Sequence, residues 1–179
     1  MAIGSLKDLY LEELNDLYDA EMQIVRALPR LAEAAHHPEL RAALSRHSEE
    51  SRLHLERLEL IFTHWGERHR TQLCAGLNGI VQEADNRVHA ATTEDTRDAV
   101  IIGAAQRIEH YVLAAYGSAR TCARRLNRSD EARLLQETLN DESRTGERLT
   151  AIVESSIAGA ESAFDAAAFG DQVAPSPAV

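Results

Sequence analysis

Cysteine, proline, glycine and aromatic residues are all scarce in this chain of 179 residues, which has 2 Cys, 4 Pro, 9 Gly and 4% aromatic residues. Cys74 and Cys122 cannot build a disulfide framework or a thiolate metal cluster, so we expect a reducing compartment. No stretch approaches the roughly 18 consecutive apolar residues of a transmembrane helix, and residues 1–10 carry no apolar signal core. The sequence therefore predicts a soluble, cytoplasmic protein that does not partner a membrane.

Positive charge is also in deficit. The 19 Lys and Arg residues face 29 Asp and Glu residues, which gives a formal net charge of −10. A general nucleic-acid binder needs a basic stripe that replaces the counterions of the phosphates. Arg120, Arg124, Arg125 and Arg128 do cluster, but they lie at the end of one expected helix, where they also favour the helix dipole. We therefore expect no nucleic-acid partner.

The composition indicates an all-α protein. Ala, Leu, Glu and Arg dominate, and no run rich in Val, Ile and Thr alternates apolar with polar residues, so no sheet is expected. The length suits one domain with a sizeable core, which we place at residues 1–160. Beyond about Gly159 the sequence becomes Ala-rich and then contains two prolines, so we expect residues 161–179 to form a mobile tail.

Apolar residues recur in alternating steps of four and three along four long segments, which predicts four amphipathic helices. The segments are 5–36, 38–65, about 95–127 and 129 to about 159. Pro29 falls late in the first segment and is expected to kink that helix rather than stop it. His36 and His37 mark a short turn, whereas residues 66–95 predict a long crossover that contains a short helix. The arrangement is two helix hairpins joined by this crossover.

In each segment these regularly spaced apolar residues form one line along the helix, which we call its seam. A carboxylate interrupts each of the four seams near its midpoint. These residues are Glu21, Glu50, Glu109 and Glu142. The seam of the second segment also carries His47 and His54, and Glu50 lies one step off it. The midpoints of packed helices lie at the same level along the axis of a bundle, so the four carboxylates are expected to meet at that level.

Converging carboxylates need compensating charge, because their mutual repulsion and the low dielectric of a core both penalise the anions. Two divalent metal ions would supply it. Carboxylates with one or two imidazoles suit iron or manganese, whereas structural zinc sites rely on thiolates. The alternative interpretation is that His47, Glu50 and His54 face solvent at the edge of the apolar stripe.

Four motifs, in order along residues 5–153, resemble the YciE/YciF stress-protein family of ferritin-like proteins. They are Leu17-Tyr18-Asp19-Ala20-Glu21-Met22-Gln23 with Ala27-Leu28-Pro29, then His47-Ser48-Glu49-Glu50 with Glu56-Arg57-Leu58-Glu59, then Ala104-Ala105-Gln106-Arg107-Ile108-Glu109-His110-Tyr111 with Tyr116-Gly117, and Leu134-Leu135 with Thr138-Leu139-Asn140-Asp141-Glu142.

The resemblance implies a ferritin-like four-helix bundle, a dinuclear iron site with two Fe ions per chain, a homodimer and a role in stress responses. The implied ligands are Glu21, His47, Glu50, Glu109 and Glu142. Two positions depart from the family pattern, which has a carboxylate at the position of Val112 and an Asp at that of Gly146. Fewer anionic ligands are expected to weaken one metal position or to leave it open to water, His54 or an exogenous ligand.

Two functions from different classes follow. In the first, a di-iron or di-manganese centre reacts with oxygen or peroxide, with Tyr18 or Tyr111 hydrogen-bonding to the ligands. For both tyrosines, and for the flanking His110, ordinary packing is the alternative. In the second, the chain is a non-enzymatic helical protein that acts in stress protection through a partner, and the glutamates are a degraded site. The sequence leaves both open, and with them whether the protein is an enzyme.

Overall fold

The computed structural model describes the backbone of residues 3–169 and the side chains of residues 3–152, and helices joined by loops make up this part of the chain. The helices are α1 (Leu6–Ala34), α2 (Pro38–His64), α3 (Ala75–Ala90), α4 (Glu94–Arg125) and α5 (Ser129–Phe169). These residues include no strand. The all-α class and the short helix within the long connection are therefore confirmed.

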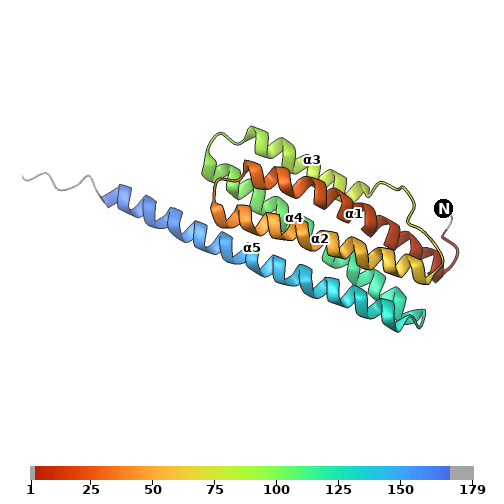
Figure 1. The fold of residues 1–179 in the computed structure, drawn as a ribbon. Helices are drawn as coiled ribbons and strands as arrows, with labels where there is room; N and C mark the ends of the chain where they lie inside the picture. The colour runs from red at the N-terminus through yellow and green to blue at the C-terminus, as the bar shows by residue number, and fades with distance from the viewer. Residues whose placement is uncertain (1–2, 170–179) are drawn as a thin grey trace, which may run out of the picture.

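The four long helices lie side by side, and α3 packs outside them against α4 and α1 (Figure 1). α1 and α5 run in one direction, whereas α2 and α4 run in the other. α1 contacts α2 and α4, and α5 also contacts α4 and α2. Each long helix therefore has two long neighbours, and side chains near the four midpoints can meet in the space between them.

Side-chain caps account for where α1 and α4 begin. Ser5 Oγ accepts the Asp8 backbone N–H at 3.1 Å before α1, and Thr93 Oγ1 accepts the Thr96 N–H at 3.2 Å before α4. Each bond satisfies a backbone donor that has no partner within its helix. Pro29 lies inside α1 without ending it, because α1 continues to Ala34.

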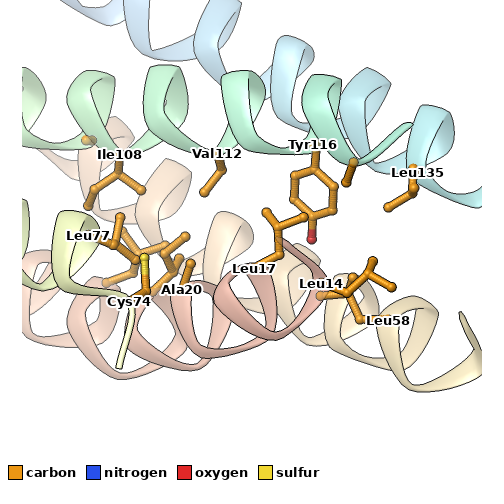
Figure 2. Packing of buried hydrophobic residues seen from close by; sticks show 14 of the residues in the cluster. Leu14, Leu17, Ala20, Leu58, Cys74, Leu77, Ile108, Val112, Tyr116 and Leu135 are labelled. Carbon is orange, nitrogen blue, oxygen red and sulfur yellow. The ribbon is translucent and has the colours of Figure 1, made fainter. Parts of the chain in front are cut away.

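The seams predicted from the periodicity are buried. Leu14 and Leu17 of α1 point towards the ring of Tyr116 of α4, and these three side chains have no exposed surface (Figure 2). Trp65 and Leu126, at the ends of their seams, are half-buried. The apolar stripes therefore hold the helices together on both sides of the polar middle.

α5 is longer than the sequence analysis expected. It continues to Phe169, so residues 161–169, which were expected to belong to a tail, have a helical backbone. The Ala-rich composition explains this, because Ala is the strongest helix former. The blue end of α5 extends beyond its neighbours (Figure 1), and residues 170–179 lie outside the described residues. None of the helices in the described part is long and apolar enough to cross a membrane.

Candidate metal centre

Three glutamates and two histidines meet near the middle of the four long helices. They are Glu21 of α1, His47 and His54 of α2, Glu109 of α4 and Glu142 of α5. The three glutamate side chains have no exposed surface, and the two histidines are 1% exposed. The structure therefore brings together five of the six residues that the sequence analysis proposed as ligands.

Helical spacing explains why these residues point inward. His47 and His54 are seven residues apart, so they lie two turns apart on one face of α2. Glu21 lies between the buried Leu17 and Ile24 on the seam of α1. The same apolar seams that bury the leucines therefore also bury the carboxylates and imidazoles.

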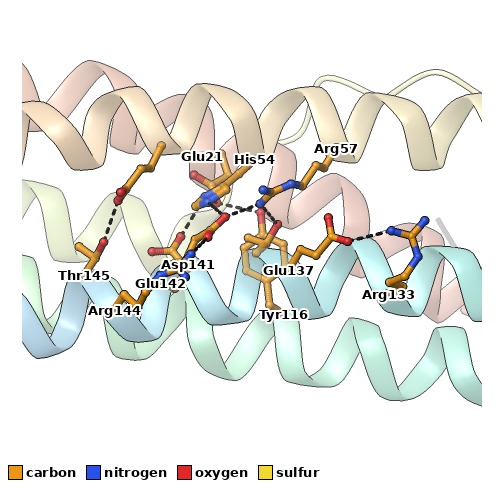
Figure 3. A network of polar contacts seen from close by, with 12 residues as sticks. Glu21, His54, Arg57, Tyr116, Arg133, Glu137, Asp141, Glu142, Arg144 and Thr145 are labelled. Atoms are coloured by element: carbon orange, nitrogen blue, oxygen red, sulfur yellow. Dashed lines mark hydrogen bonds and ion pairs between the residues drawn. The ribbon is translucent and has the colours of Figure 1, made fainter.

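One group consists of Glu21, His54 and Glu142 (Figure 3). His54 Nδ1 lies 3.2 Å from Glu21 Oε1 and 3.2 Å from Glu142 Oε1. The hydroxyl of Tyr116 donates a hydrogen bond to Glu21 Oε1 at 2.8 Å. Tyr116 therefore fixes the carboxylate of Glu21. The sequence analysis did not predict this role, because a tyrosine among the buried apolar residues of a helix is usually a packing residue.

The second group consists of His47, Glu109 and Glu142. His47 Nδ1 lies 2.9 Å from Glu109 Oε1, and His47 Nε2 lies 3.3 Å from Glu142 Oε2. Within each group, one ligand-type atom from every residue lies within 4.8 Å of the others. Glu142 belongs to both groups, so its two oxygens link them.

Many polar atoms of this cluster form no hydrogen bond of regular geometry, although several of them lie within ion-pair distance of one another. They are both oxygens of Glu109, both oxygens of Glu142, both ring nitrogens of His47, Nε2 of His54 and Oε2 of Glu21. Buried polar atoms are nearly always paired, because an unpaired one costs about 1–3 kcal/mol or more. Carboxylate oxygens and imidazole nitrogens that face one another at these distances fit a metal ion, which would satisfy them together.

Without a metal, protons compensate part of the charge. Burial lowers the pKa of His54, but its contacts with Glu21 and Glu142 prevail and raise it to about 10. The pKa of His47 is also raised, since its contacts with Glu109 and Glu142 outweigh its burial. Burial raises the pKa of Glu109 to about 8. The cluster therefore holds protons at neutral pH, and a metal ion would have to displace them.

Glu142 behaves in the opposite way. Burial raises its pKa, but the close ion-pair contacts with His47 and His54 outweigh burial and hold the pKa well below 4.5. Glu142 is therefore the carboxylate that stays ionised between two imidazolium groups.

An ion pair borders the cluster on the His54 side. Arg57 Nη1 lies 2.6 Å from Asp141 Oδ2, and the same oxygen lies 3.6 Å from His54 Nε2 (Figure 3). Asp141 is 18% exposed and Arg57 is 25% exposed, so they separate His54 from solvent. The position of Asp141 directly before Glu142 was the available sequence signal for this contact.

Glu50 does not join the cluster, contrary to the expected convergence of four glutamates. Its side chain is 23% exposed, accepts a hydrogen bond from Thr145 Oγ1 at 2.9 Å and pairs with Arg148 Nη1 at 3.2 Å. The reason is its place one step off the seam, which turns the carboxylate towards the flank of α5. Arg148 then neutralises a charge that a metal was expected to neutralise.

The two tyrosines proposed as partners of the ligands contact other groups. Tyr18 donates to Glu59 Oε1 at 2.8 Å on the surface, and Tyr111 donates to Asp16 Oδ2 at 3.1 Å. Tyr111 also lies 3.0 Å from the thiol of Cys74, which is buried. Neither tyrosine therefore holds a residue of the cluster.

The two departures from the family pattern lie in different surroundings. Val112 is buried in the hydrophobic core, as Figure 2 shows. A Cβ atom at Gly146 would meet nothing within 4 Å, so this position of α5 is open. His36 and His37 lie between α1 and α2, as the predicted turn requires. His36 is exposed and forms a surface ion pair with Glu94 at 3.2 Å, whereas His37 is half-buried.

Comparison with known proteins shows the family to which the chain belongs. The family described as a domain of unknown function, DUF892, matches residues 5–161. Protein YciF of Escherichia coli (strain K12) is 34% identical over 151 residues, which cover 84% of this chain and 91% of YciF.

Two solved structures agree with this assignment. The E. coli stress protein YciF aligns with a TM-score of 0.83 at 33% identity and covers 87% of this chain and 98% of its own. YcfI of Rhodopseudomonas palustris, which has been suggested to be a structural protein, aligns with a TM-score of 0.81 at 34% identity, over 83% of this chain and 94% of its own. The chain therefore belongs to the DUF892 family and is similar to YciF, as its four motifs indicated.

Proposed function

We propose that this protein is a ferritin-like metal-binding protein of the stress response that holds two divalent ions, iron or alternatively manganese. Glu21 and His54 would bind one ion, His47 and Glu109 the other, and Glu142 would bridge them. The observation that carries the proposal is the set of buried carboxylate and imidazole atoms that lack hydrogen-bond partners. Two antiparallel helix pairs with carboxylates at their midpoints support the ferritin-like arrangement.

The donor set favours iron or manganese over zinc. Carboxylates and imidazoles surround both groups, and neither group includes a cysteine. Structural zinc sites are commonly built on thiolates, whereas harder donors suit manganese and non-haem iron. When bound, a pair of iron ions supplies reversible redox chemistry towards oxygen or peroxide. Tyr116 orients Glu21, and the apolar seams on both sides of the cluster exclude bulk water.

The experiment begins with the metal content of full-length protein purified without added metal. The metal-free protein is then loaded with Fe(II) under anaerobic conditions and exposed to oxygen or peroxide while its absorbance is recorded. We expect about two irons per chain, the number that a bridged pair of sites holds, and an absorbance change after the oxidant is added. No bound iron before or after loading would overturn the proposal.

The alternative is a helical protein that protects through contacts with a partner and no longer binds metal. It is favoured by the pairing of Glu50 with Arg148 and by the apolar Val112 in the core. Glu142→Ala separates the two functions. With a working centre the parent protein binds metal and the variant loses it, whereas with a degraded site neither protein binds metal. In the metal-free state the variant should be less stable in either case, because His47 and His54 lose their shared counter-charge.

We also propose a homodimer. Leu53 and Leu60 support it, since they are 51% and 46% exposed and lie seven residues apart on one face of α2. Light scattering of the full chain should give the mass of two copies, and Leu60→Glu should reduce it to one. A monomer in the unchanged protein would contradict the proposal.

A further inference from the structure

A cleft of about 390 Å³ lies against the Glu109 side of the cluster. Helices α4 and α5 form its walls, with Glu109 and His110 on α4 and Gly146 and Glu147 on α5. His110 and Glu147 are exposed, whereas Glu109 has no exposed surface. The cleft therefore begins at solvent and ends at a buried residue of the cluster.

The chemistry of the lining suits a cation. Glu147 contributes a carboxylate at the mouth, and Gln106 and Ser143 contribute uncharged oxygens, while the lining includes no Lys or Arg. His110 Nδ1 donates to the backbone carbonyl of Gln106 at 2.7 Å. In the neutral ring this leaves Nε2 as the unprotonated nitrogen, which is the form that binds a metal.

Glu109 supplies an independent reason to place a cation at the inner end. Both of its carboxylate oxygens are buried and form no hydrogen bond of regular geometry, and only Oε1 has a close ion-pair contact. It lines the cleft on one side and contacts His47 on the other, at 2.9 Å. Glu109 would therefore be the first residue of the cluster that a cation moving along the cleft contacts.

Gly146 keeps the cleft open. A Cβ atom at this position would meet nothing within 4 Å. Glycine inside a helix is about 1 kcal/mol less favourable than alanine, so its presence in α5 calls for a reason. The absence of a side chain here leaves room beside Glu109 that a larger residue would fill.

The opposite flank of the cluster is less suited to cations. There Arg57 Nη1 lies 2.6 Å from Asp141 Oδ2, and that oxygen lies 3.6 Å from His54 Nε2 (Figure 3). The guanidinium group repels an approaching cation and occupies the oxygen that would first bind it. The charge distribution therefore favours approach from the α4–α5 side.

We propose that this cleft is the access route by which a divalent cation reaches the centre, with Glu147 and His110 as its transient ligands. The inference rests on the proposed function, because it assumes that the centre binds metal. Since Glu109 has no exposed surface, the last step requires the side chains around it to move.

The test follows Co²⁺ uptake by the full-length metal-free protein, using the absorbance of the bound ion after rapid mixing. Gly146→Leu should fill the cleft and slow uptake about tenfold, because the ion must then wait for local opening. Gly117→Leu is the matched control, since it also lies inside a helix with nothing within 4 Å of a Cβ atom. It should leave the rate of uptake unchanged.

A second pair of variants tests the charge at the mouth. Glu147→Gln should slow uptake about threefold to tenfold at low ionic strength, and added salt should reduce the difference, as expected for electrostatic steering. Glu137→Gln, also on α5 but away from the cleft and with a side chain that is 44% exposed, is its control.

The outcomes separate the two proposals. Normal Co²⁺ binding with equal uptake rates in Gly146→Leu, Glu147→Gln and the parent would overturn the access route and leave the proposed function standing. No Co²⁺ binding by the parent protein would overturn the proposed function and the route together. Slow uptake in both cleft variants, with the controls at the parent rate, supports the route.

Discussion

Oε1 of Glu142 lies 3.2 Å from Nδ1 of His54. The other oxygen of the same carboxylate lies 3.3 Å from His47 Nε2, so one side chain of α5 joins two histidines that are two turns apart on α2. Glu21 and Glu109 each contact one of these histidines. Glu142 is therefore the residue on which both groups depend.

This shared position predicts unequal effects of glutamate variants on metal binding. Glu142→Gln should weaken both metal positions, and Glu109→Gln should weaken one. We expect each affected position to lose at least about tenfold in affinity, by analogy with the loss of supporting groups around metal ligands. Isothermal titration of the metal-free variants with Mn²⁺ or Co²⁺ measures both affinity and stoichiometry.

Glu50→Gln is the matched control for these variants. Glu50 lies on α2 but outside both groups, where it pairs with Arg148. The variant should bind as much metal as the parent protein. A loss of metal as large as that of Glu142→Gln would show that Glu50 turns towards the ions when they bind.

Metal removal should lower thermal stability. An ion that binds the folded chain and not the unfolded chain stabilises it by about 2.7 kcal/mol at a free concentration of 100 times its Kd. For a chain of this size, that corresponds to a rise in Tm of roughly 5–10 °C. Scanning calorimetry of chelated and reloaded protein measures the rise, and Glu142→Gln should show little of it.

The metal-free protein should lose stability as the pH rises from about 6.5 to about 10. The pKa of His54 is raised from 6.5 to about 10 in the folded chain. A raised pKa means that the folded state binds the proton more tightly, so its stabilising contribution is complete below 6.5 and is lost by about 10. Glu109, whose pKa is raised from 4.5 to about 8, contributes in the same direction.

Acid should destabilise the protein through other groups. Burial tends to raise the pKa of Asp141, but Arg57 outweighs it and lowers that pKa below 3.8. Its stabilising contribution is therefore present above 3.8 and is lost as the pH falls further. The Tm of the metal-free protein should therefore be highest between about pH 3.8, below which Asp141 loses its contribution, and about pH 6.5, above which His54 loses its own. A Tm that rises steadily from pH 6.5 to pH 10 would contradict the protonated cluster.

Gly76→Ala should destabilise the packing of α3. A Cβ atom there would lie 2.7 Å from Cε2 of Tyr111, whose hydroxyl bonds Asp16 and contacts the thiol of Cys74, so the ring cannot move away freely. We expect a loss of about 1–3 kcal/mol in the free energy of unfolding, the range typical of overpacking. Urea denaturation followed by circular dichroism measures it.

Gly79→Ala, three residues along the same helix, provides the comparison. A Cβ atom at Gly79 would meet nothing within 4 Å. Alanine there should therefore stabilise the protein by about 0.5–1 kcal/mol through its better helix propensity. Equal effects of the two substitutions would contradict the close approach of Gly76 to Tyr111.

The sequence by itself determined the helices and the inward-facing residues of their seams. A period of alternating four and three residues identifies one face of a helix, and burial of that face follows from its apolar neighbours. Glu21, Glu109 and Glu142 were therefore placed correctly at buried positions. Periodicity did not predict that α5 continues to Phe169, because the Ala-rich residues after 159 show no apolar stripe. Their helix propensity was the signal for a helix there.

The tertiary structure alone decided which side chains meet. Glu50 lies close enough to the seam to look like a ligand, but the partner that faces it is Arg148 of α5, which no pattern within α2 reveals. In the same way, Tyr116 looked like an ordinary core residue until the packing of α4 on α1 set its hydroxyl against Glu21. Periodicity specifies the face of one helix, whereas the rotation and axial shift between packed helices specify the contacts.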